Sequence, residues 1–219
     1  YEKLNLNAKQ LTTSTLALNE QFGTSAKFGD QLTAEFTAIK FALNLSEETM
    51  KSFAGTAVAT GTSMKDNLEI INDTTMQLIK DNKLALNQRK IQESIGKISK
   101  SILLNSRRNF KELTKSVFAA KRLGIEMSGL ESIQGNLLNF EQSIQSELEA
   151  ELLLGKELNL EKARLAALQG DMATLGKEIL SNEAIMEAFS SGNVISQEAA
   201  AKALGMSREE LAKMIDNQQ

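Results

Sequence analysis

The chain contains no proline among its 219 residues. An average protein of this length has roughly ten, because proline makes up about 5% of residues. Proline interrupts helix interiors and is excluded from central β-strands. The chain is instead rich in Ala, Leu, Glu, Lys and Gln, which are strong helix formers. The sequence therefore predicts an all-α fold.

Aromatic residues are scarce. They make up 5% of the chain, with no Trp and one Tyr. A globular core usually contains more large rings, whereas thin helical packing needs fewer. We therefore expect an elongated protein in which long, partly coiled-coil-like helices are followed by a bundle of short helices.

Histidine and cysteine are both absent. This removes the usual general base near neutral pH, as well as thiolate chemistry, disulfides and zinc or iron–sulfur sites. The remaining metal ligands are oxygens, which favour Mg or Ca. The sequence thus predicts no catalytic residue, no metal site, no cofactor and no small-molecule substrate, and hence no enzyme.

No apolar run is long enough for a transmembrane helix. The first residues, YEKLNLNAKQ, do not form a signal peptide and include no initiator Met. We expect a processed chain or a piece of a longer polypeptide.

Turn and capping residues divide the chain into three parts. Asn44 and Ser46 stand between two predicted helices, and Ser63 opens a long one. Near the end of the chain, Ser207 and Glu210 have the spacing of a capping box. The predicted parts are short and medium helices in 1–62, long helices in 63–154 and short capped helices in 155–219.

Gly55 and Gly61 lie among Thr and Ser residues and invite comparison with a phosphate-binding loop. That motif needs four residues between the glycines, followed by Lys. Here five residues separate them, and Thr62 stands in place of the Lys. The comparison fails, and the segment is predicted to connect two helices.

Four isoleucines are spaced by four, three and four residues, which is typical of a coiled-coil seam. They are Ile91, Ile95, Ile98 and Ile102. From Phe110 onward the apolar stripe resumes one residue out of this register. Either one helix spanning 87–121 changes its partner or supercoil near 105–108, or a helix ends or bends there.

Two adjacent segments carry opposite charge. Residues 87–122 contain ten Lys or Arg against two Glu, whereas residues 126–161 contain eight Glu against one Lys. Gly124 lies in the turn between them, and Ser128 with Glu131 has capping-box spacing. We expect an antiparallel basic–acidic hairpin within 63–154, paired in one chain or between chains.

The alternative use of the basic 87–122 segment is binding to nucleic acid or to an acidic membrane surface. The segment lacks the aromatic residues on which single-stranded bases stack. It also matches no recognition-helix motif. The pairing of the two charged segments is therefore the favoured interpretation.

Glu147, Glu149 and Glu151 form the densest acidic cluster. Paired carboxylates serve acid–base hydrolysis or bind hard cations, and Glu147 and Glu151 share a helix face. No apolar environment is arranged around them to raise a carboxyl pKa. The cluster is predicted to form a solvated helix face.

Residues 137–171 read LLNFEQSIQSELEAELLLGKELNLEKARLAALQGD. They contain an aromatic-Glu-x-Ser-Ile stretch, then Gly-Lys-Glu-Leu-Asn-Leu-Glu-Lys-Ala-Arg, then Ala-Leu-x-Gly-Asp. This pattern resembles the tail-length tape-measure proteins of contractile-tailed bacteriophages. The upstream ISKSILLNSRRNFKELTKSVFAAKRLGI is similar in character, so the resemblance covers about residues 95–172.

The resemblance implies a viral structural protein that lies in several copies in the lumen of the virion tail. Such proteins are very long, set tail length and are ejected at infection, after synthesis in the bacterial host cytoplasm. The implied partners are copies of itself in a trimer or hexamer, tail-tube proteins, baseplate or tail-tip proteins, and the genome end. The family brings no catalytic residue to this region.

Apolar residues at helical spacing are the candidate interface between copies. The predicted interface residues are Ile91, Ile95, Ile98, Ile102, Ile133, Leu137, Phe140, Ile144, Leu148 and Leu152.

Overall fold

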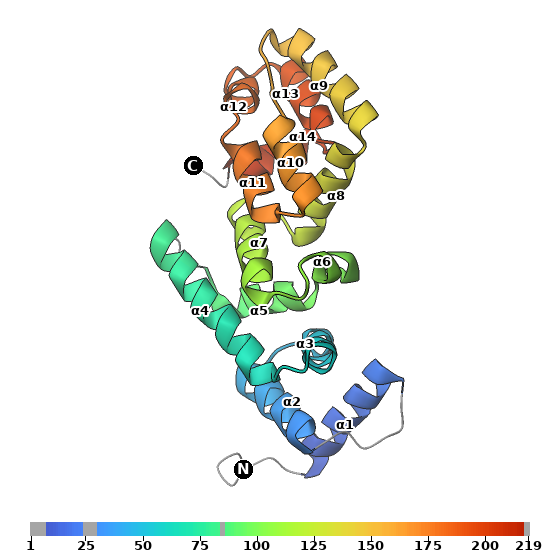
Figure 1. The fold of residues 1–219 in the computed structure, drawn as a ribbon. Coiled ribbons are helices and arrows are strands. Elements are labelled where there is room, and N and C mark those ends of the chain that lie inside the picture. Colours follow the sequence, from blue (N-terminus) through green and yellow to red (C-terminus); the bar gives the residue numbers. More distant parts are fainter. Residues whose placement is uncertain (1–7, 24–29, 84–85, 217–219) are drawn as a thin grey trace. The chain divides into compact units, whose positions relative to one another are not determined.

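The computed structural model describes residues 8–23, 30–83 and 86–216. These residues form fourteen α-helices and no strand, which confirms the all-α prediction (Figure 1). The longest helix, α4, has 19 residues. Within the described part of the chain, no helix combines the length and apolarity needed to cross a membrane.

The helices divide into two compact units, Tyr1–Lys115 and Ser116–Gln219. The division falls inside α7 and differs from the predicted boundaries after residues 62 and 154. The reason is tertiary packing: α4 and α5 pack with α2 and α3, whereas α8 and α9 pack with the helices that follow them.

The first unit is held together by contacts of α3 with α1, α2, α4 and α5. The edge of one ring meets the face of another where Phe53 packs on Phe110, with centroids 5.8 Å apart. The unit contains α1 (Ala8–Phe22), α2 (Asp30–Leu43), α3 (Glu47–Thr60), α4 (Met64–Asn82), α5 (Gln88–Gly96), α6 (Lys100–Asn105) and the start of α7 (Phe110–Arg122).

Several predicted caps are confirmed in this unit. The side chains of Ser46 and Ser63 accept hydrogen bonds from Thr49 N and Asp66 N at the starts of α3 and α4. The predicted helix connection at 55–61 was placed too early. Gly55 lies inside α3, because α3 buries Thr56 and Ala57 in the next turn and ends only at the left-handed Gly61.

The basic segment is three helices and not one. α5 ends at Gly96, and the Ser99 side chain caps α6 by accepting from Ile102 N at 3.3 Å. α6 ends at Asn105, followed by the left-handed residues Arg107 and Arg108. Of the two alternatives at 105–108, the helix end is therefore correct. The extra break at 97–99 interrupts the predicted isoleucine seam.

The second unit contains the rest of α7 and seven more helices. α9 packs most extensively against α13, and α10 packs between α8 and α11. The helices are α8 (Met127–Leu138), α9 (Phe140–Leu154), α10 (Glu161–Gln169), α11 (Met172–Leu180), α12 (Glu183–Ser190), α13 (Val194–Ala203) and α14 (Arg208–Asp216).

The capping predictions in the second unit have mixed outcomes. The reciprocal capping box is confirmed: Ser207 N donates to Glu210 at 2.9 Å, and Glu210 N donates to the Ser207 hydroxyl at 3.2 Å. The box predicted at Ser128 is wrong, because α8 starts two residues earlier, with Glu126 at its N-cap.

The turn at Gly124 is also as predicted, but the long hairpin around it is not observed. Gly124 is left-handed, and Ile125 N closes the helix end on Ala120 O at 3.1 Å. One ion pair, Lys121 to Glu126 at 2.6 Å, spans the turn. In place of long helices, 63–154 contains the separate helices α4 to α9, which are distributed over both units.

Glu93 of α5 joins this helix to the start of α3. Its carboxylate accepts from Ser46 N at 2.7 Å, from the Ser46 hydroxyl at 2.6 Å and from the Thr49 hydroxyl at 2.7 Å. Burial raises the pKa of Glu93, but the bonds from Ser46 and Thr49 lower it by more, so the net shift is downward from 4.5. The negative charge also suits a helix N-terminus.

This bond network predicts an acid-sensitive first unit. A carboxylate with a lowered folded-state pKa stabilises the fold above its unfolded pKa, and the stabilisation is lost as pH falls through the folded value. We expect Glu93→Gln to cost about 1–2 kcal/mol at neutral pH. The difference from the unmodified protein should shrink below pH 4.5, as measured by amide hydrogen exchange of α3 and α5. A difference that is equal at pH 7 and at pH 3 would contradict this assignment.

Candidate interaction surfaces

The inner face of α9 carries small side chains and one glutamate, Glu147. Ser143 and Ala150 are buried, and the opposing helix α13 buries Ala199, Ala200 and Ala203. Small residues on both helices allow their backbones to approach closely. This explains why α9 packs so extensively on α13 without placing a large apolar side chain inside.

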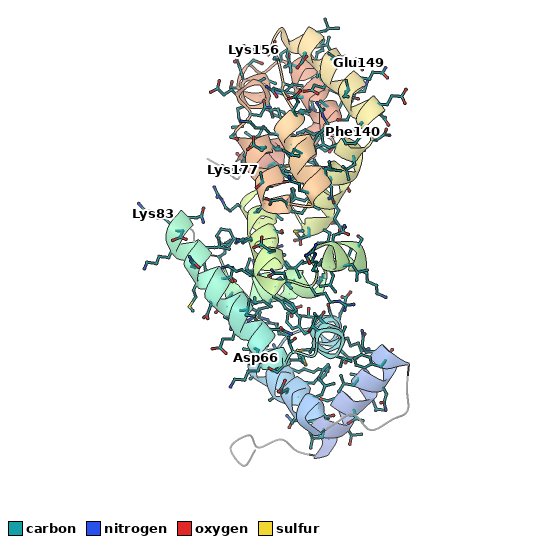
Figure 2. The ribbon with its side chains drawn as sticks, in the orientation of Figure 1. Asp66, Lys83, Phe140, Glu149, Lys156 and Lys177 are labelled. Atoms are coloured by element: carbon teal, nitrogen blue, oxygen red, sulfur yellow. The ribbon has the colours of Figure 1, made fainter. Side chains whose placement is uncertain are left out.

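The outer face of α9 carries the large apolar side chains. They follow one another at intervals of four residues, so they form one stripe on the helix. Their exposed fractions rise along the stripe: Phe140 46%, Ile144 46%, Leu148 55% and Leu152 85%. We call these four residues the α9 stripe. Phe140 and Glu149 of this helix are labelled in Figure 2.

This distribution is the reverse of an ordinary amphipathic helix, which turns its apolar residues to the core. A contiguous exposed apolar patch on a folded protein marks an interaction site. The α9 stripe is therefore the best candidate for a contact surface in the second unit.

The structure separates the ten predicted interface residues into three groups by their burial. Ile98 is half-buried, and the α9 stripe is exposed. The others are buried in the cores of their own units and are not available to a partner. These core residues are Ile91, Ile95, Ile102, Ile133 and Leu137.

The prediction that Glu147, Glu149 and Glu151 form a solvated helix face is wrong for Glu147. Only 6% of the residue is exposed. Its carboxylate accepts from Arg164 at 2.5 Å and from Leu160 N at 2.6 Å, and Arg164 also donates to the Ser143 hydroxyl at 3.2 Å. The charge is buried because it neutralises Arg164 and binds the start of α10.

The neighbouring glutamates behave differently. Glu151 accepts from Leu158 N at 2.9 Å, so Glu147 and Glu151 hold the same loop and the prediction of a shared face is confirmed. Glu149 pairs with Lys202 at 2.8 Å, and hydrogen bonds from Lys202 and then Gln145 lower its pKa. Glu147 and Glu151 thus hold the joint between α9 and α10 together, whereas Glu149 links α9 to α13.

A groove of about 700 Å³ lies in the first unit, between α1, α3, α5 and α6. Its apolar lining includes Phe22, Ile98, Leu103 and Leu104, and Leu104 is 60% exposed. Gly96 lies where α5 packs closely on α3. A Cβ atom added at this position would lie 2.5 Å from the Thr49 side chain. We call this feature the α6 groove.

The α6 groove is lined by charges of both signs. Lys51, Lys100 and Arg108 line it together with Glu47 and Glu48, and Lys51 is paired with Glu20 and Glu47. Between residues 94 and 111 the chain has five Lys or Arg and no acid. The Nε of Arg108 is buried, and it has no hydrogen-bond acceptor among the described residues.

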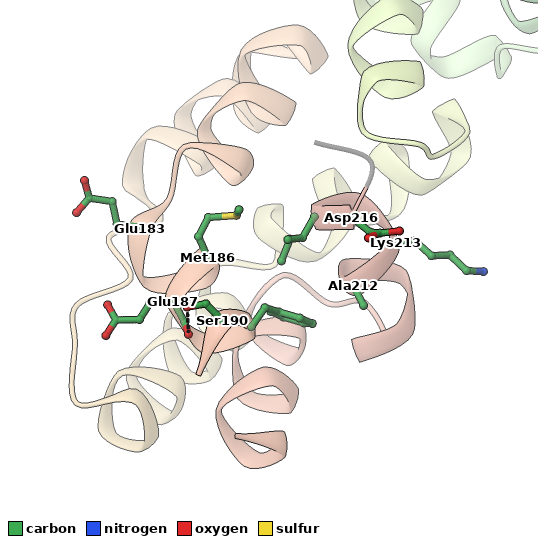
Figure 3. Close-up of a pocket in the computed structure, with 9 residues that line it drawn as sticks. Glu183, Met186, Glu187, Ser190, Ala212, Lys213 and Asp216 are labelled. Atoms are coloured by element: carbon green, nitrogen blue, oxygen red, sulfur yellow. Dashed lines mark hydrogen bonds between the residues drawn. The ribbon is translucent and has the colours of Figure 1, made fainter. Parts of the chain in front are cut away.

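A second pocket lies between α12 and α14 (Figure 3). Met186, Phe189 and Ile215 give it an apolar lining. Glu183 and Glu187 point away from α14 in this view, and Glu187 pairs with Lys156. The pocket offers apolar contact and brings no pair of reactive side chains together.

In the part of the chain that the structure describes, acidic side chains form no group that could hold a metal ion. No protein-family model, curated protein or solved structure matches this chain.

Proposed function

We propose that the chain is a structural assembly protein that associates with copies of itself through the α9 stripe. The single observation that supports this proposal is the placement of four large apolar side chains on the outward face of α9. Folding alone stabilises a helix of this kind little, because its large apolar side chains remain exposed to water. Covering the stripe in an assembly removes that apolar area from water.

We further propose that the assembly is part of a tape measure in the tail lumen of a contractile-tailed bacteriophage. The support is the resemblance carried by residues 95–172, which include the α9 stripe. In this role the chain sets tail length, is ejected at infection and contacts tail-tube, baseplate or tail-tip proteins. A parent gene of many hundreds of codons beside tail genes is the expected context, and a stand-alone gene of about 219 codons would contradict it.

Self-association is tested by replacing one residue of the stripe. Burying a leucine contributes about 1.5–3 kcal/mol, which corresponds to roughly ten- to a hundredfold in a dissociation constant. Leu148→Glu should therefore weaken the oligomer at least about tenfold in sedimentation velocity over a range of concentrations. The unmodified chain should sediment as a discrete oligomer, such as a trimer or hexamer.

Leu168→Glu is the matched control. Leu168 lies on α10 and is 63% exposed, so this substitution replaces a similarly exposed leucine at a site outside the stripe. Its oligomer should match that of the unmodified chain. An unmodified chain that stays monomeric at every concentration would refute self-association.

The second candidate function is a helical binding module for nucleic acid or an acidic membrane surface. It is favoured by the five basic residues between positions 94 and 111, where no acid occurs. Binding of this kind weakens steeply as salt displaces phosphate contacts. Salt-dependent retention on heparin by a monomeric chain would favour this candidate over assembly.

A further inference from the structure

We propose that α5 and α6 are two halves of one helix, which the attachment of α5 to α3 keeps apart. When α5 leaves α3, the halves join, and the isoleucine seam of the joined helix pairs with the same seam of other copies. The seam consists of Ile91, Ile95, Ile98 and Ile102. The α9 stripe takes no part in this contact, so the inference goes beyond the proposed self-association and is tested separately from it.

The spacing of the seam matches a helix that the structure does not contain. Intervals of four, three and four residues place all four isoleucines on one side only if the chain is helical throughout 88–105. In the structure α5 ends at Gly96 and α6 begins at Lys100, and three of the isoleucines are buried in their own unit. A local pattern that disagrees with the fold around it indicates a competing packing of the same segment.

The break between the two helices contains no residue that forbids a helix. Lys97 has φ −97° and ψ 3°, and Ser99 has φ −61° and ψ 152°. Both φ values are negative, in contrast to those of Arg107 and Arg108 beyond the end of α6. No proline or glycine lies within 97–105, so every residue there can adopt helical torsions. Joining the two helices therefore requires no unfavourable backbone conformation.

Contacts with α3 hold α5 in its present position. Glu93 accepts three hydrogen bonds from Ser46 and Thr49 at the start of α3, at 2.6 to 2.7 Å. The backbone of Gly96 lies so close to Thr49 that a Cβ would not fit between them. In contrast, α6 is lightly packed, since only Ile102 of its six residues is buried. Release of α5 from α3 is therefore the step that frees the seam.

The joined helix is suited to pairing with copies of itself. Charged residues at the positions that flank a coiled-coil seam set the choice of partner. Here the flanking residues are uncharged: Gln92, Ser94, Ser99 and Ser101. The charged residues of 88–105 all fall on the remaining positions, away from the seam. They are Arg89, Lys90, Glu93, Lys97 and Lys100. The like charges of two copies are therefore kept apart, although the segment is basic.

The residue type of the seam determines the number of copies. Isoleucine at both core positions of the heptad favours coiled coils of three or four strands over dimers. Each isoleucine leaves one apolar environment and enters another, so the burial lost in the first unit is regained between copies. This exchange allows a small change at α5 to decide between the two packings.

The test uses full-length chains that all carry Leu148→Glu, so that the α9 stripe is damaged in each. Gly96→Ala releases α5, because the added Cβ would lie 2.5 Å from Thr49 and alanine favours the joined helix. In sedimentation velocity this chain should form trimers or tetramers, at least about tenfold more tightly than the chain with Leu148→Glu alone. Gly135→Ala is the matched control and should not associate, because a Cβ there meets no atom within 4 Å.

Two further measurements identify the seam and the joined helix. Adding Ile98→Asp to Gly96→Ala should restore the monomer. Spin labels are attached through Lys90→Cys and Asn105→Cys, both at exposed positions of a chain without cysteine. In one straight helix the Cα atoms of these residues lie about 22 Å apart, and the associated chain should show this separation. Glu93→Gln is a second release variant that adds no Cβ, so unfolding caused by Gly96→Ala does not decide the outcome.

Other results would overturn the inference. If Gly96→Ala and Glu93→Gln both leave the chain monomeric, release of α5 frees no associating seam. If association survives Ile98→Asp, it uses another surface of the loosened unit. If the labels in the oligomer lie closer together than in one helix, α5 and α6 remain separate. Because the α9 stripe is damaged in every chain, failure of the proposed self-association produces none of these results.

Discussion

Replacing Glu147 by Gln is expected to destabilise the second unit by about 3 kcal/mol, because it leaves Arg164 with an uncompensated buried charge. Arg164 and Glu147 have side-chain exposures of 11% and 9%. The amide of Gln can still accept from Leu160 N, so the loss falls on the ion pair. Breaking a buried pair costs more than the pair itself contributes, because the remaining charge must be paid for in desolvation.

The expected loss is local and is measured by hydrogen exchange. The amides of Leu158 and Leu160, which donate to Glu151 and Glu147, should exchange faster in the variant. Glu149→Gln is the control: it removes the same charge from the same helix, at an exposed pair with Lys202. It should change stability little, because exposed pairs contribute little. Equal effects of the two substitutions would contradict the structural role of Glu147.

Replacing Gly96 by Ala is expected to destabilise the first unit by about 3 kcal/mol through overpacking. An added Cβ would lie 2.5 Å from the Thr49 side chain and 2.6 Å from its Cα. The obstructing atom belongs to the backbone, so rotation of a side chain cannot relieve the clash. α3 and α5 must move apart, which also lengthens the bonds that Glu93 accepts from Ser46 and Thr49.

Gly135→Ala is the matched control for this substitution. Gly135 is also a helical glycine, but a Cβ there meets no atom within 4 Å. Alanine is the better helix former by up to about 1 kcal/mol, so this variant should be as stable as the unmodified chain or more so. Thermal unfolding followed by circular dichroism compares the two. A Gly96→Ala protein that unfolds at the temperature of the unmodified chain would show that α3 and α5 separate at no cost.

The sequence alone determined the features that depend on local hydrogen bonding. The lack of proline indicated helices throughout, and the cap at Ser46 and the box at Ser207–Glu210 formed where predicted. α9 ends at Gly155, next to the predicted boundary between 63–154 and 155–219, and Gly155 and Asn159 both adopt positive φ angles there. A cap is satisfied by residues three or four positions apart, so its pattern is visible in the chain itself.

Only the tertiary structure decided which apolar and acidic residues face inward. Ile91 and Leu148 both belong to apolar stripes at helical spacing, yet Ile91 is fully buried and Leu148 is 55% exposed. Spacing specifies a helix face but not what covers it, because the covering residues come from distant parts of the chain. For the same reason the sequence predicts Glu147 on the surface, whereas the structure pairs it with Arg164 of the next helix. Burial is a property of long-range packing, and this packing divides the chain into two units and leaves the α9 stripe uncovered.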